Sequence, residues 1–92
     1  MTGIGEDAVN SLFDLYPNPN GGSFTIDMRI PGVESWKLKI FNILGSEIWS
    51  ENLGVVNGNM LKSIDLRQED SGVYYIQLYN DHVTLRRKVV IY

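Results

Sequence analysis

The C-terminal segment constrains the fold of this chain more than any other stretch. Two runs rich in β-branched and aromatic residues, 72–80 and 83–92, lie on either side of Asn80-Asp81-His82. Such runs flanking turn-forming residues predict a β-hairpin. The first run places alternate apolar side chains on one face, with the period of two that is typical of a half-buried strand. These inward residues are Tyr74, Ile76 and Leu78.

The second run of the hairpin combines core residues with a basic cluster. Its apolar residues share one parity, and Arg87 occupies the same parity among them. Either a β-bulge near residues 86–88 moves Arg87 to the other face, or its stem lies along the core while its guanidinium reaches water. The apolar residues of that parity are Val83, Leu85, Val89 and Ile91.

The rest of the chain repeats short alternating runs, and residues 23–30 alternate most clearly. Turn signals such as Pro31-Gly32, Leu44-Gly45 and Asn57-Gly58 recur about every eight to twelve residues, and no amphipathic helical period is present. This pattern predicts an all-β fold, a seven-stranded immunoglobulin-like β-sandwich. The expected strands are residues 12–16, 23–30, 36–40, 46–52, 60–66, 72–80 and 83–92.

Two stretches near the N-terminus lack a strand pattern. Residues 1–11 contain glycines, acidic residues and few large side chains, which predicts a flexible linker before a folded domain of residues 12–92. The segment PNPNGG at 17–22 has two prolines in three residues, so it sustains neither a β-ladder nor a helix. It predicts a rigid corner after a short edge strand.

The segment Asp70-Ser-Gly-Val-Tyr74 resembles the tyrosine corner of immunoglobulin domains, in which the tyrosine hydroxyl bonds to nearby backbone. Ile76 stands where antibody domains place a cysteine. Trp36 shares parity with Leu38 and Ile40, so we expect it to pack in the core across from Ile76.

Composition excludes several functional classes. A net charge of −3 argues against nucleic-acid binding, which needs a surplus of lysine and arginine. No apolar run is long enough to cross a bilayer. The chain has no cysteine, which excludes disulfides and thiol catalysis but leaves the cellular compartment open.

No catalytic or metal-binding constellation is visible in the sequence. His82, the one histidine, falls in a predicted turn and is interpreted as solvated. Asp65, Glu69 and Asp70 lack the spacing of a calcium loop and predict an acidic surface loop. We therefore expect no metal, no cofactor and no enzymatic activity.

Two surface features leave alternatives open. Trp49, Tyr75 and Tyr79 would form an exposed aromatic patch for a sugar or protein partner, or would simply lie over the pleated sheet. Trp49 is expected to face outward because it follows an inward Ile48. The basic Arg86-Arg87-Lys88 segment either protects an edge strand from aggregation or docks an acidic partner.

Taken in order, several motifs resemble the C-terminal sorting domain, type A, of proteins exported by the type IX secretion system of Bacteroidetes. The resemblance covers nearly the whole chain. It is carried by LYPNPNGGSF at 15–24, FNILGSEI at 41–48, Leu66 with SGVY at 71–74, and LRRKVVI at 85–91. Asn42, where the family often has aspartate, and Tyr92, where many members end on lysine, depart from the pattern.

The resemblance implies an immunoglobulin-like sandwich that follows a larger cargo domain. The outer-membrane type IX translocon and its shuttle proteins would read the domain and pass the cargo from the periplasm to the cell surface or medium. A sortase-like cysteine peptidase would then remove the domain, with the cargo anchored to surface lipopolysaccharide or released. The cleavage region is expected at Gly3, Ile4, Gly5, Glu6, Asp7 and Ala8.

The resemblance also implies a set of residues that contact the translocation machinery. An adhesion or carbohydrate-binding module is the alternative function, and self-association is left open. The expected contact residues are Pro17, Asn18, Pro19, Gly45, Gly72, Tyr74, Arg86, Arg87, Lys88, Val89, Val90 and Tyr92.

Overall fold

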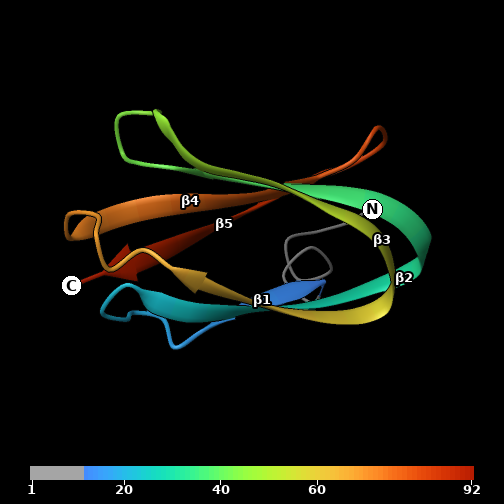
Figure 1. Cartoon of the computed structure of the whole chain (residues 1–92), viewed down its shortest axis with the longest axis horizontal. Helices are drawn as coiled ribbons and strands as arrows, with labels where there is room; N and C mark the ends of the chain where they lie inside the picture. Colours follow the sequence, from blue (N-terminus) through green and yellow to red (C-terminus); the bar gives the residue numbers. More distant parts are fainter. Residues whose placement is uncertain (1–11) are drawn as a thin grey trace, which may run out of the picture.

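The computed structural model, which describes residues 12–92, contains five strands hydrogen-bonded into one sheet and no helix in that range (Figure 1). The prediction of an all-β fold is therefore confirmed. The strands are β1 (Phe13–Tyr16), β2 (Ser23–Phe41), β3 (Glu47–Asp65), β4 (Gly72–Tyr79) and β5 (Thr84–Ile91).

Within residues 12–92 the number of strands is five, not the predicted seven, because two pairs of expected strands are continuous. The predicted turns at Pro31-Gly32 and Asn57-Gly58 lie inside β2 and β3. Gly32 and Gly58 do have positive φ angles, 87° and 84°. Pairing nonetheless continues past them: Ile30 lies opposite Gly58, and the next pair joins Val33 to Asn57. The glycines thus bend a continuous hairpin through a bulge instead of ending its strands.

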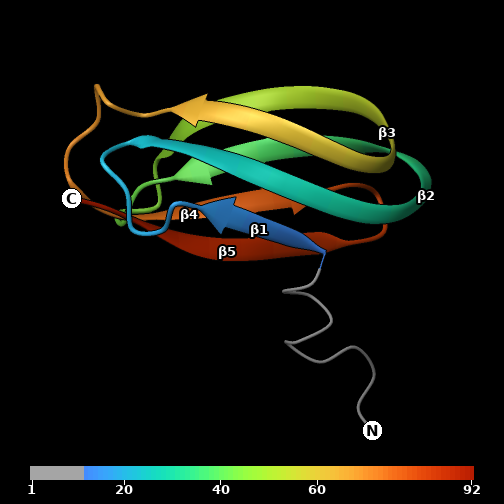
Figure 2. The ribbon, with the colours of Figure 1, turned by 90° about the horizontal axis from the view of Figure 1, so that it is seen from below.

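The bend folds the sheet back on itself, so that two layers face each other. In one layer the first half of β2 pairs with β1 and with the second half of β3. In the other layer the second half of β2 pairs with the first half of β3 and with β4, which in turn pairs with β5. Figure 2 shows both long strands curving from one layer to the other at the same end of the molecule.

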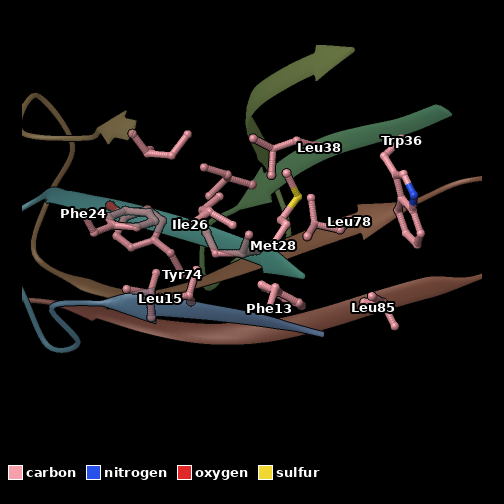
Figure 3. Packing of buried hydrophobic residues seen from close by; sticks show 14 of the residues in the cluster. Phe13, Leu15, Phe24, Ile26, Met28, Trp36, Leu38, Tyr74, Leu78 and Leu85 are labelled. Atoms are coloured by element: carbon pink, nitrogen blue, oxygen red, sulfur yellow. The ribbon is translucent and has the colours of Figure 1, made fainter. Parts of the chain in front are cut away.

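The core fills the space between these layers (Figure 3). As predicted, alternate residues of the C-terminal hairpin point into it, and Trp36 is buried. The strands pair because burying this set of side chains removes a large apolar area from water. The most deeply buried apolar side chains are Phe13, Ile26, Met28, Leu38, Ile40, Ile64, Ile76, Leu78 and Val89.

On one side of the bent sheet, both layers end in β3. Trp49 lies opposite buried Ile40, so it shares the inward face, and the expectation that it points outward was wrong by one residue of register. Its indole nitrogen donates a hydrogen bond to Glu51 (3.2 Å), and Glu51 forms an ion pair with Lys62. Glu51 and Lys62 lie on opposite halves of the bent strand, so this pair links the two layers across their open side.

Candidate partner-binding site

The other side of the bent sheet is formed by the edges of β1 and β5. Among the five strands, β5 pairs only with β4, so it is an edge strand of the sheet, as predicted. Figure 2 shows β1 and β5 side by side, both running toward the end where the chain terminates. We call this side, where β1 and β5 lie next to each other, the seam. It brings the expected contact residues of the N- and C-terminal motifs together.

The loop at residues 17–22 occupies the outer edge of β5. The Asn18 side chain donates to the Lys88 carbonyl (3.2 Å) and accepts from the Val90 N–H (3.1 Å). The backbone of Asn20 donates to the Val90 carbonyl (3.0 Å) and accepts from the Tyr92 N–H (2.9 Å). The edge of β5 from residue 88 to residue 92 is therefore already hydrogen-bonded within the domain.

Asn20 also organises its own loop, a role that the sequence interpretation missed. It is the one buried polar residue among those described, with 1% of its surface exposed. Its side chain donates to the Pro17 carbonyl (2.9 Å) and accepts from the Gly22 N–H (2.7 Å). Asn20-Gly21 reads as an ordinary turn pair in the sequence, and nothing in that pattern distinguishes a buried asparagine from a solvated one.

Farther along the seam, Arg87 of β5 bonds to residues of β1. It lies opposite Ile76 in an unbroken register, so the bulge alternative was wrong and the snorkelling alternative holds. Its guanidinium lies 5.8 Å from the centroid of the Phe13 ring and donates to the Phe13 carbonyl (2.8 Å) and to Asp14 (3.0 Å). An inward-pointing charge on an edge strand hinders pairing with another chain.

Asp14, which the sequence interpretation did not single out, is shared by two arginines. Its second carboxylate oxygen lies 2.8 Å from a guanidinium nitrogen of Arg29. Hydrogen bonds from Arg29 and then Arg87 hold the pKa of Asp14 below its ordinary value of 3.8. Asp14 thereby connects the β1 edge to both β2 and β5.

We expect the free energy of unfolding of Asp14→Asn to fall less steeply than that of the wild type as the pH is lowered. Because the folded-state pKa is depressed, the carboxylate stabilises the fold above its unfolded-state pKa of 3.8, and this contribution is lost as pH falls through the folded value. The effect is modest, since 48% of the side chain is exposed and water screens the pair. Urea unfolding between about pH 5 and pH 2 measures it. Asp81→Asn, at an exposed turn residue without an ion pair in the described chain, is the control. Equal slopes for the wild type and Asp14→Asn would contradict the assignment.

The remaining basic residues of β5 point outward. Arg86 is exposed and donates to Gln77 (2.7 Å), and Lys88 is exposed. Edge protection by Arg87 and docking by Arg86 and Lys88 are therefore compatible, because the two roles fall on opposite faces of the strand.

The tyrosine corner lies at the same end of the molecule as the chain terminus. The Tyr74 hydroxyl donates to the Asp70 carbonyl, as predicted, and burial raises the Tyr74 pKa. Gly72 and Tyr74 line a hollow of about 230 Å³, together with residues of the 42–46 turn. In that turn the Asn42 side chain accepts from the Leu44 and Ser46 N–H groups, at 3.0 and 2.9 Å, and Gly45 has a φ of 87°.

The expected contact residues thus divide by exposure. Val89 and Tyr74 are buried and serve the core, while Gly72, Arg87 and Val90 are half-buried. The expected cleavage residues, 3–8, lie outside the described part of the chain. The exposed contact residues are Pro17, Asn18, Pro19, Gly45, Arg86, Lys88 and Tyr92.

Across residues 12–92, no group of three or more histidine, cysteine, aspartate or glutamate side chains is arranged to hold a metal ion. His82 is exposed in the β4–β5 turn, 3.9 Å from Glu34. Nor does the described part of the chain contain a helix long and apolar enough to cross a membrane.

Fold and site together define a small all-β domain whose final strand is an edge strand held by an N-terminal loop. A family model described as the secretion system C-terminal sorting domain, Por_Secre_tail, matches residues 14–92. The chain therefore belongs to this family, the C-terminal sorting domains of the type IX secretion system, and the resemblance seen in the sequence is confirmed. A search among curated proteins gave no match.

Proposed function

We propose that this domain directs a larger cargo protein across the outer membrane through the type IX translocon and its shuttle proteins. The single observation that carries the proposal is the family match, which spans β1 to β5 and so includes the whole described fold except its first residues. A sortase-like cysteine peptidase then cuts within residues 3–8, and the cargo is anchored to surface lipopolysaccharide or released. The domain itself performs no catalysis.

The translocation machinery would recognise side chains at the end of the molecule where Tyr92 lies, and not the outer backbone edge of β5. Asn18 and Asn20 already use that edge between residues 88 and 92. Tyr92, by contrast, is 75% exposed, and Leu44 in the neighbouring turn is 86% exposed. Exposed apolar side chains gathered at one end are suited to a partner that buries them.

We also propose that the fold is immunoglobulin-like. Each of the seven predicted runs keeps a separate place in the two layers, even though four of them are joined in β2 and β3. The tyrosine corner formed by Tyr74 and Asp70 supports the same relationship.

A fusion of residues 2–92 to a fluorescent reporter with a periplasmic signal peptide tests the proposed function in a host that has the secretion system. The intact fusion should reach the surface or medium, and a reporter without the domain should stay in the periplasm. Deleting residues 86–92 is a poor control, because it also removes buried Val89 and Ile91.

Point variants of exposed residues separate recognition from folding. Tyr92→Ala should lower the exported fraction, whereas Leu61→Ala, at a 66% exposed apolar residue of β3, should not. If the folded, intact fusion stays in the periplasm, the sorting function is excluded for this chain.

A further inference from the structure

The outer face of the layer that contains β4 gathers basic residues from strands distant in sequence. Lys37 and Lys39 of β2 alternate with buried Trp36 and Leu38, so they point outward. On the same face, Gln77 of β4 lies between Lys39 and Arg86 in the paired register. We call Lys37, Lys39, Arg86 and Lys88 the basic face.

The basic face contains the cations that lack acidic partners. Lys37, Arg86 and Lys88 form no ion pair within the described residues, and Lys39 pairs with Glu47 (3.1 Å). The other cations of the described chain all form ion pairs: Arg29, Lys62, Arg67 and Arg87. A chain with a net charge of −3 thus concentrates its unpaired positive charge on one sheet face.

The acidic groups near this face lie at its margins. Glu47 neutralises Lys39, and Glu34 and Asp81 line the same hollow as Lys37 at the β4–β5 turn. Arg86 and Lys88, at the opposite margin, form no ion pair with an acidic residue within residues 12–92. The positive charge is therefore strongest along β5.

The chemistry of the basic face favours a phosphate-rich surface over a protein or a sugar as its partner. Its middle row, Lys39, Gln77 and Arg86, is polar, whereas the buried centre of a protein interface is usually depleted of charge. Lys39 covers the Tyr79 ring and Arg86 covers the Phe41 ring, each at 5.7 Å, which leaves those ring faces less open to a sugar. Cations on a pleated face, spaced by about 7 Å along a strand and about 10 Å across two strands, suit a planar array of phosphates.

We propose that the basic face docks on a membrane surface rich in anionic phospholipid headgroups. Juxtamembrane lysine and arginine residues gain attraction from the negative potential of such a surface. The half-buried tyrosines of β4 would lie at headgroup level, where the amphipathic ring is favoured. This docking is additional to the recognition of the sorting signal and does not depend on it.

Co-sedimentation of the 92-residue chain with vesicles tests the proposal. Vesicles of equal parts phosphatidylcholine and phosphatidylglycerol should bind the chain, and pure phosphatidylcholine should not. Added salt should weaken the binding. Arg86→Gln with Lys88→Gln should lower the partition coefficient about 30-fold, since each cation near such a surface contributes a factor of about five and the two factors multiply.

The matched control is Arg86→Lys with Lys88→Arg, which keeps both charges and should retain binding. Circular dichroism establishes that both double variants are folded. Equal binding to the two vesicle types, or binding to neither, overturns the proposal. So does binding to soluble dextran sulfate without binding to vesicles, or salt-dependent dimerisation that the glutamine variant abolishes.

Discussion

Replacing Asn20 by alanine is expected to lower the free energy of unfolding by about 2–3 kcal/mol. The substitution removes the acceptor of the buried Gly22 N–H and the donor to the Pro17 carbonyl. Because Asn20 is 1% exposed, water does not readily replace these bonds, and a cavity is left behind. For a domain of this size the loss is a large fraction of the total stability. Urea unfolding monitored by tryptophan fluorescence measures it.

Asn18→Ala is the matched control, because it removes the same kind of side chain from the same loop. Asn18 is exposed, so water can satisfy the Lys88 carbonyl and the Val90 N–H after the change. We expect a loss of no more than about 1 kcal/mol. Equal losses for the two variants would show that burial of Asn20 does not set the stability of the loop.

Gly22→Ala is expected to cost about 2–4 kcal/mol. Gly22 has a φ of 110°, which a residue with a side chain rarely adopts. An added Cβ would also lie 2.9 Å from the Cα of Arg67 and 3.0 Å from its backbone nitrogen. Since these are backbone atoms, relief would require moving the chain near the Leu66 N–H, which donates to the Gly22 carbonyl (2.6 Å).

The neighbouring glycine provides the control for this variant. An added Cβ at Gly21 meets no atom within 4 Å, and Gly21 is not among the glycines with positive φ. Gly21→Ala should therefore leave the urea midpoint nearly unchanged or raise it slightly. A Gly22→Ala midpoint equal to that of Gly21→Ala would contradict the strain argument.

Local periodicity was sufficient to predict the hairpin of β4 and β5, the buried faces of β2 and β4 and the tyrosine corner. These features depend on residues two to four positions apart. The continuity of β2 and β3 could not be predicted in the same way. Pro31-Gly32 has the chemistry of a turn, and only the long-range pairing of Ile30 with Gly58 makes it a bend.

Only part of the candidate site could be predicted, again because the rest depends on contacts between residues distant in the sequence. The basic residues of β5 are visible in the sequence, but the two faces they occupy depend on the absence of a bulge at Arg87. Asp14 was not predicted because its partner Arg87 lies 73 residues away along the chain. The side chain of Asn20 bonds locally, but its backbone pairs with Val90 and Tyr92 at the far end of the chain. A pattern within a short window carries no information about such contacts.

The seam between β1 and β5 has a mechanical consequence. The two strands run side by side in the same direction, so β1 begins at one end of the molecule and β5 ends at the other (Figure 2). A force that pulls those two points apart slides one strand along the other. Such shear loads the bonds made by Asn18, Asn20 and Arg87 together, instead of peeling them away one at a time. A pull on the start of β1 against the end of β5 would thus be resisted by all of these bonds at once.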